Sequence, residues 1–266
     1  MTALPTWVVG VPIAAVIALL ALHFRALNRS GAVAAWLLGM LAMAAGWDWG
    51  GYLVTYFVAA SALSRFRAEE KARRTGAAAV RSGARDAVQV AANGALFGIA
   101  AAAYAIEPGI IAMAIGVASL AASAADTWAT EIGSLSKDLP RSAWSMQPVS
   151  PGTSGGVTPL GIAASLAAGL FSSLVALAIG WPMVIAVAAL VGAITGSAVD
   201  SILGASLQGR FWCDSCAAET EARVHLCGSH TRTVGGWSWL DNDGVNLAAT
   251  VAGAVDGAVV VYLIGA

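Results

Sequence analysis

The sequence predicts an all-α, polytopic integral membrane protein with about eight transmembrane helices. Hydrophobic residues make up 58% of its 266 residues and charged residues only 11%, a far more apolar balance than soluble domains have. Apolar segments long enough to cross a bilayer, about 17 to 25 residues each, recur along the chain. All 14 basic residues fall in alternate connections between these segments, as short cytoplasmic loops require. We therefore expect one membrane domain covering residues 1–266.

The predicted helices follow one another with few long connections. They are placed at residues 5–24, 31–47, 49–65, 87–106, 109–129, 157–180, 182–205 and 244–264. The first lacks a basic start and an Ala-x-Ala cleavage signal, so we interpret it as a retained helix rather than a signal peptide. Residues 47–51 must supply a tight interfacial turn between the second and third helices, with their tryptophans at headgroup level.

The basic residues follow the first, third, fifth and seventh predicted helices, which makes these four connections cytoplasmic and places both termini outside. They are Arg25, Arg29, Arg65, Arg67, Lys71, Arg73, Arg74, Arg81, Arg85, Lys137, Arg141, Arg210, Arg223 and Arg232. The run that follows Arg65 is expected to be a solvated or headgroup-facing helix with no catalytic role. In a prokaryote the protein would lie in the cell membrane. The net charge of −1 gives no reason to expect a nucleic acid partner.

Residues 125–161 carry the strongest functional signal, because they place acids and a glycine loop between two apolar segments. Asp126 and Thr130 lie four residues apart on one row of a helix, and Thr127 and Glu131 form the neighbouring row. Hard oxygen ligands gathered at one helix end are the kind that Mg²⁺ prefers. Lys137, in the loop that follows, could offset developing negative charge.

The glycine loop at residues 151–156 leads into a helix that we expect to begin with Thr158 as N-cap and Pro159 as its first residue. Glycines allow backbone N–H groups to converge on phosphate oxygens, and a helix N-terminus adds positive charge. The candidate phosphate ligands are Gly152, Thr153, Ser154, Gly155, Gly156 and Thr158. A flexible turn is the alternative, because the loop has no Walker lysine.

Further acids stand near the cytoplasmic ends of the last two predicted helices. Asp200 lies in a row of small residues with Gly192, Gly196 and Gly204, a spacing that allows close helix approach. An acid there is costly unless it is paired or binds a metal. The final predicted helix begins with two acids and two asparagines, namely Asp241, Asn242, Asp243 and Asn246. Asp243 is the expected N-cap, and because a cap needs only one such residue, the others are candidates for a functional role.

The predicted topology brings these groups to one membrane face, where a magnesium nucleotide could bind. The expected Mg²⁺ ligands are Asp126, Glu131, Asp200, Asp241 and Asp243, with Thr127, Asn242 and Asn246 beside the nucleotide. Arg85 could stabilise charge at the same end. Arg85, Gln89 and Asn93 form one helical stripe, which serves equally well as interhelical hydrogen-bonding groups or as site lining. Asp256 lies deep in the last helix and has no assigned role.

A cytoplasmic insert at residues 208–240 contains all three cysteines of the chain. Cys213, Cys216, Cys227 and His230 have the spacing C-x2-C-x10-C-x2-H, which predicts a small structural zinc ribbon. His225 is the alternative fourth ligand. Cytoplasmic thiols stay reduced, so a disulfide is not expected, and unmetallated thiols are the competing interpretation.

The motifs ADTWATEIG, PGTSGGVT, GSAVDSILGASLQ and WLDNDGVN together resemble an integral membrane family, long of unknown function, that includes the plant phytyl-phosphate kinase. The family is distantly similar to CTP-dependent dolichol and phytol kinases. The resemblance implies phosphoryl transfer from a nucleoside triphosphate, with CTP favoured, to a prenyl monophosphate. It does not cover the cysteine insert. The positions to which it implies a role are Asp126, Thr127, Glu131, Gly152, Thr153, Gly155, Gly156, Asp200, Asp241, Asn242, Asp243 and Asn246.

We therefore expect a membrane kinase whose lipid substrate lies between helices with its headgroup at the cytoplasmic interface. Two related activities stay open, namely a prenyl alcohol kinase and a cytidylyltransferase that forms a CDP-lipid. A lipid or small-molecule transporter is the alternative from another class, although no repeat is evident and only Asp256 is deep. A homodimer is also left open.

Overall fold

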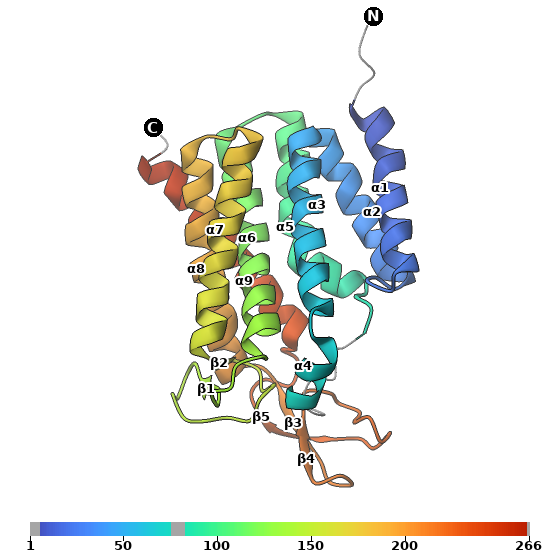
Figure 1. The fold of residues 1–266 in the computed structure, drawn as a ribbon, viewed down its shortest axis with the longest axis vertical. Helices are drawn as coiled ribbons and strands as arrows, with labels where there is room; N and C mark the ends of the chain where they lie inside the picture. The colour runs from blue at the N-terminus through green and yellow to red at the C-terminus, as the bar shows by residue number, and fades with distance from the viewer. Residues whose placement is uncertain (1–5, 76–82, 265–266) are drawn as a thin grey trace, which may run out of the picture.

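The computed structural model describes residues 6–75 and 83–264, and Arg81 of the basic run lies outside these ranges. Within them the chain forms long helices that run up and down the molecule (Figure 1), with one short helix and five short strands at one end. The helices are α1 (Thr6–His23), α2 (Arg29–Ala45), α3 (Trp47–Arg65), α4 (Ala68–Thr75), α5 (Ala87–Ile106), α6 (Ile110–Gly133), α7 (Pro159–Ile179), α8 (Met183–Ser206) and α9 (Asn242–Ile264).

Among the described residues, five helices, α5 to α9, are long and apolar enough to cross a membrane. The prediction of eight spans is therefore confirmed only for these five. Residues 8–23 and α2 form shorter apolar helices, and α3 carries polar residues such as Asp48 and Thr55 that reduce its apolar character. Large apolar side chains on outer helix faces, such as Leu19 and Leu174, are more than 60% exposed, as expected where lipid surrounds the protein.

Helix α6 is the centre of the fold, because small residues let its neighbours approach closely. Its segment from Val117 to Ala125 is buried throughout. A Cβ atom on Gly192 of α8 would lie 2.7 Å from Ala118 Cβ, and one on Gly253 of α9 would lie 2.8 Å from Ala118 O. The predicted close approach of small residues is thus confirmed for α8.

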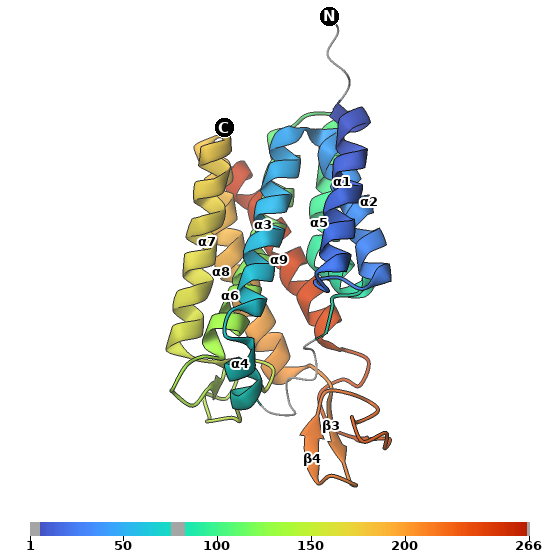
Figure 2. The same cartoon turned by 45° about the vertical axis from the view of Figure 1, so that its right-hand side comes forward.

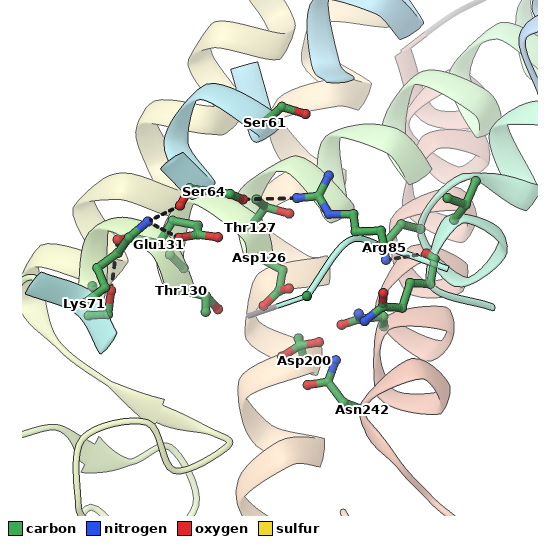
Figure 3. A pocket seen from close by; sticks show the side chains of 18 of the residues that line it. Ser61, Ser64, Lys71, Arg85, Asp126, Thr127, Thr130, Glu131, Asp200 and Asn242 are labelled. Carbon is green, nitrogen blue, oxygen red and sulfur yellow. Dashed lines mark hydrogen bonds and ion pairs between the residues drawn. The ribbon is translucent and has the colours of Figure 1, made fainter. Parts of the chain in front are cut away.

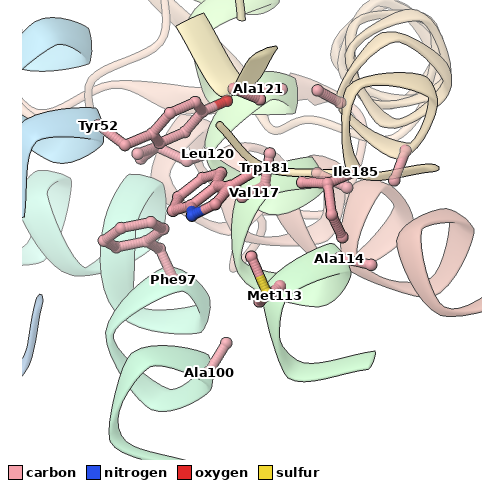
Figure 4. Close-up of a cluster of buried hydrophobic side chains, with 14 of the residues drawn as sticks. Tyr52, Phe97, Ala100, Met113, Ala114, Val117, Leu120, Ala121, Trp181 and Ile185 are labelled. Carbon is pink, nitrogen blue, oxygen red and sulfur yellow. The ribbon is translucent and has the colours of Figure 1, made fainter. Parts of the chain in front are cut away.

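Aromatic and aliphatic side chains form a core where α3, α5, α6 and the start of α8 meet (Figure 4). Tyr52, Phe97, Trp181 and Ile185 are all less than 10% exposed. Trp181 also donates from Nε1 to Asp48 Oδ2 at 2.8 Å, which ties α3 to the α7–α8 connection.

The connection between α2 and α3 differs from the predicted turn at residues 47–51. Gly46 alone makes the turn, with a φ of 145° that an L side chain rarely adopts, and Trp47 already begins α3. Trp49 is fully buried and packs on Phe97, with ring centroids 5.2 Å apart. The headgroup position predicted for the tryptophans is therefore wrong for Trp49, because its ring packs inside the protein core.

The strands all lie at the lower end of Figure 1, which we call the insert end. β1 (Arg141–Ser142) pairs antiparallel with β2 (Gly156–Val157), which closes the glycine loop. The insert contains β3 (Arg210–Cys213), β4 (Ala218–Thr220) and β5 (Arg232–Gly235) in the antiparallel order β4-β3-β5. Figure 2 shows this sheet below α8 and α9. Gly209 N donates to Leu240 O at 2.8 Å, which joins the two ends of the insert.

Candidate functional site

A cavity of about 1590 Å³ extends from the insert end along the bundle, and its lining includes every residue that the sequence proposed for the magnesium and nucleotide site except Asp243. Those residues are Arg85, Asp126, Thr127, Glu131, Lys137, Gly152, Thr153, Ser154, Gly155, Gly156, Thr158, Asp200, Asp241, Asn242 and Asn246. The full lining comes from all the helices α1 to α9 and from the insert, which therefore meet around one space. Asp243 is not among the lining residues.

Two acids on neighbouring helices form the centre of this cavity. Asp126 on α6 and Asp200 on α8 face each other, and Asn242 at the start of α9 lies beside them (Figure 3). Oδ2 of Asp200 is buried and has no hydrogen-bond partner in the described structure. Two facing carboxylates at low solvent access repel each other unless a cation or a shared proton lies between them. This donor set fits Mg²⁺, which binds through one or two carboxylates and keeps several waters.

The start of α9 is capped by a different aspartate from the one predicted. Asp241 Oδ1 accepts a hydrogen bond from Gly244 N at 3.0 Å. Asp241 is thus the N-cap residue, because α9 begins at Asn242, and the prediction that Asp243 caps the helix is wrong. A carboxylate that satisfies a helix N-terminus is partly committed to that role, so Asp126 and Asp200 are better candidates than Asp241 for holding a metal ion.

Glu131 has a partner that the sequence did not indicate. Lys71 Nζ forms an ion pair with Glu131 Oε2 and also donates to Leu63 O at 2.8 Å and Ser64 O at 3.0 Å. Lys71 is only 8% exposed, so this pair docks α4 between the ends of α3 and α6. The metal-ligand role predicted for Glu131 must therefore compete with a largely buried lysine.

Helix α4 lines the cavity with one face, which the sequence did not indicate, while Ala68, Glu69, Ala72 and Arg73 are exposed, as a solvated or headgroup-facing helix requires. Lys71, Arg74 and Thr75 all line the cavity, and Arg74 Nη1 donates to Ser136 O at 2.8 Å. Their i, i+3, i+4 spacing places them on one helix face. The spacing could have shown that these three residues share a face, but it does not indicate whether that face contacts solvent, lipid headgroups or protein.

The glycine loop forms a wall of the cavity and is held in place by its own hydrogen bonds. Thr158 Oγ1 accepts from Gly161 N at 3.0 Å and Pro159 is the first residue of α7, so the predicted helix start is confirmed. The N–H groups of Thr153, Ser154 and Gly156 already donate to Ser150 O, Glu221 Oε1 and Thr153 O. A phosphate cradle made of these amides stays a prediction and would require the bonds to open.

Close packing explains the glycine at one loop position. Gly155 has a φ of +69°, and a Cβ atom there would overlap the backbone of Ala205 on α8. The loop therefore lies directly against the helix that carries Asp200.

Basic side chains are numerous in the wall of the cavity that contains the acid pair. Seven of them line the cavity, namely Arg25, Arg65, Lys71, Arg74, Arg85, Lys137 and Arg223. Arg85 is fixed by its backbone, because its O accepts from Asn28 N at 3.0 Å and its N donates to Ala26 O at 3.1 Å. Its Nη2 donates to Ser64 Oγ at 3.3 Å. A cavity that contains both basic side chains and a carboxylate pair is suited to bind an anion together with a metal cation.

The stripe on α5 serves both of the roles that the sequence left open. Asn93 Oδ1 accepts from Ser123 Oγ at 2.7 Å, and Tyr56 shares a hydrogen bond of 2.7 Å with the same hydroxyl. Gln89 completes a capping box with Asp86. Both Gln89 and Asn93 also line the cavity.

The cavity continues from this polar chamber into an apolar arm between α1, α2, α3 and α5. Its lining there includes Ile13, Ile17, Leu38, Val54, Phe57 and Val90. The arm lies beside the first helices of the chain, to which the sequence gave only a scaffold role. A chamber with charged walls that opens into an apolar arm suits an amphipathic ligand.

The insert brings the three cysteines together with His225 and not with His230. Ligand atoms of Cys213, Cys216, His225 and Cys227 all lie within 4.8 Å of one another. His230 is not part of this group, so the geometry favours the alternative, His225, as the fourth candidate ligand. Hydrogen bonds from Ser229 and His225 lower the pKa of the Cys227 thiol to about 5, and its hydrogen bond with Cys216 raises the pKa of the Cys216 thiol to about 11.

Comparisons with known proteins agree with the membrane fold. Residues 12–254 match the family model described as integral membrane protein DUF92. Protein PGR of Arabidopsis thaliana is 31% identical over 267 residues, which covers 90% of this chain and 91% of that protein. An uncharacterized membrane protein of Synechocystis sp. is 31% identical over 83% of this chain and 77% of its own length. An uncharacterized membrane protein of Methanocaldococcus jannaschii is 25% identical over 95% of this chain and 93% of its own length. No solved structure matches.

Proposed function

This chain belongs to the integral membrane protein family DUF92, and from the chemistry of its cavity we propose that it is a magnesium-dependent membrane phosphotransferase. Its substrates would be a nucleoside triphosphate and an isoprenoid monophosphate, and its product the lipid diphosphate. The observation that carries the proposal is the Asp126–Asp200 pair, which lies in a basic chamber that opens into an apolar arm. The resemblance to CTP-dependent lipid kinases favours CTP as the donor.

The chamber supplies what phosphoryl transfer needs, since catalysis of this reaction is mainly positioning and charge stabilisation. Asp126 and Asp200 would hold Mg²⁺, which would supply positive charge to neutralise the charge that develops on the phosphates. Arg85 and Lys137, which line the chamber, would bind the phosphates from its walls.

An oxygen of the acceptor phosphate would attack the γ-phosphorus as the bond to the β-bridging oxygen breaks and the nucleoside diphosphate leaves. The attacking oxygen is already ionised, so no dedicated general base is required.

The arrangement of the bundle supports a cytoplasmic location for this chamber. The basic connections, the acid pair and the insert share one end, and α1 begins and α9 ends at the other (Figure 1). Because short basic loops stay cytoplasmic, the substrates would enter from the cytoplasm and both termini would lie outside.

The test of this proposal is a matrix of donors and acceptors with purified protein in lipid nanodiscs. CTP, ATP, GTP and UTP are each supplied with Mg²⁺ and with prenyl alcohols or prenyl monophosphates, and lipid products are identified by mass spectrometry. We expect prenyl diphosphate, formed fastest with CTP. A prenyl monophosphate made from the alcohol would identify an alcohol kinase, and the absence of any phosphorylated lipid would overturn the proposal.

The apolar arm predicts a chain-length effect. Ile17→Trp adds bulk inside the arm and should lower kcat/KM for long-chain prenyl phosphates by about tenfold, with little change for short-chain ones, because pocket discrimination of this kind amounts to about 1 to 3 kcal/mol. Val16→Trp is the matched control, since Val16 is 55% exposed on the outer face of α1. Equal rates for both variants with every acceptor would show that the tail lies elsewhere.

Transport is the second candidate, and Asp256 is the observation that favours it. Its Oδ2 is buried without a hydrogen-bond partner, and acids at this depth in a membrane helix often mark ion pathways. Flux of a prenyl phosphate across proteoliposomes in the absence of nucleotide would support transport.

A further inference from the structure

We propose that Cys213, Cys216, His225 and Cys227 form a structural zinc site that fixes the insert against the glycine loop. This site does not depend on the phosphotransferase proposal, since it can be measured without substrate. The donor set of three thiolates and one imidazole is of the kind that structural Zn²⁺ sites use, in a closed tetrahedral arrangement.

The distances in the cluster match a tetrahedral metal site. Zn–S bonds of about 2.3 Å at tetrahedral angles place sulfur atoms about 3.8 Å apart. Cys213 Sγ lies 3.6 Å from Cys227 Sγ, and His225 Nδ1 lies 3.2 Å from Cys227 Sγ. The sulfur separation is far too long for a disulfide, whose S–S bond is about 2.05 Å.

Two tight turns bring the ligands together. Cys213 ends β3 and Cys216 lies in the turn to β4, where Ala217 has a φ of +49°. In the second turn Gly228 N donates to His225 O at 2.8 Å, with Gly228 at a φ of +84°. Each turn thus presents two ligands, as paired knuckles do in small zinc domains.

Apart from its three-stranded sheet, the insert has few large buried side chains to hold it in this shape. Phe211 and Cys213 are buried, but Leu226 is 71% exposed and Trp239 is 68% exposed. A segment with so little apolar burial gains most of its folding free energy from a bound metal. Metal binding would therefore order the segment from Cys213 to Cys227.

That segment also reaches the cavity. Glu221, which lies between the two ligand pairs, accepts from Ser154 N at 3.2 Å and from Gln208 Nε2 at 2.9 Å. Gln208 Nε2 donates in turn to Ser154 Oγ at 3.0 Å. The metal site is therefore linked to the glycine loop through Glu221, and its loss should loosen the loop as well as the insert.

Metal content is the direct test. Protein purified without a histidine tag under reducing conditions should contain about one zinc per chain, and cobalt substitution should give the visible absorption of tetrahedral thiolate-bound Co²⁺. His225→Ala should lower zinc affinity by at least about tenfold. His230→Ala is the matched control and should retain zinc. Zinc below about 0.1 per chain in the wild type would overturn the proposal, as would loss of zinc in His230→Ala but not in His225→Ala.

The link to the glycine loop has its own measurement. In Cys213→Ser/Cys216→Ser, hydrogen–deuterium exchange at residues 151–156 should rise, while far-UV circular dichroism shows that the membrane helices persist, because these satisfy their backbone internally. Glu221→Gln should raise exchange at the same residues and keep its zinc. Unchanged exchange in both variants would overturn the link and leave zinc as a local staple only.

Discussion

Asp126→Asn and Asp200→Asn are each expected to reduce lipid phosphorylation by about 1000-fold or more without unfolding the protein. Losing a ligand of the catalytic metal removes several kcal/mol of charge stabilisation, and each 1.36 kcal/mol is a tenfold change in rate. The fold should persist, because either change relieves the repulsion between two carboxylates that face each other. Initial rates at saturating Mg²⁺ and melting temperatures in detergent are the two measurements.

Two other acids provide the comparison. Asp256→Asn changes an acid whose Oδ2 is buried but which does not line the cavity, and it should leave the rate near the wild-type value. Glu131→Gln should lower the melting temperature more than Asp126→Asn does, since it leaves the buried Lys71 without its charged partner. Full activity of both Asp126→Asn and Asp200→Asn would show that the metal binds elsewhere.

Gly196→Leu is expected to abolish the folded state altogether. A Cβ atom at Gly196 would overlap Ala122 Cβ on α6 and lie 3.1 Å from Ala249 O on α9, so a leucine would force three packed helices apart. Overpacking of this kind costs about 1 to 3 kcal/mol where side chains can shift, and here backbone atoms stand in the way. We expect aggregation or degradation on expression, detected by size-exclusion chromatography of a fluorescent fusion.

The matched control for this change is Ala198→Leu. Ala198 lies two residues further along α8 on an exposed face, where a larger apolar side chain meets lipid. A monodisperse Gly196→Leu protein with wild-type thermal stability would contradict the three-helix packing.

The helices were predictable because membrane-spanning segments are long, apolar and nearly complete in themselves. The caps followed from local chemistry, as Thr158 shows, although the choice between Asp241 and Asp243 depended on a one-residue shift in where α9 begins. The clustering of the acids could be predicted from the topology alone, because the topology places the helix ends that carry them at the same face of the membrane.

The partnerships across the cavity could not be predicted in this way. Nothing in the periodicity of residues 68–75 says that Lys71 reaches Glu131, because a charged face can meet solvent, lipid headgroups or protein. The choice of His225 over His230 depends on turn geometry at Gly228, which spacing between ligands does not fix. The apolar arm arises from packing between four helices, and each of them alone has an ordinary apolar sequence.

The central claim is that the Asp126–Asp200 chamber transfers a phosphoryl group to a lipid phosphate, and the fate of a labelled phosphate tests it most directly. Purified protein is incubated with Mg²⁺, a prenyl monophosphate and CTP labelled at either the γ- or the α-phosphorus, with Asp126→Asn as the control. Our account predicts that the γ-label alone enters the lipid, that CDP is released, and that the variant incorporates no label. Transfer of the α-label with release of pyrophosphate, or γ-label transfer that persists in Asp126→Asn, would contradict it.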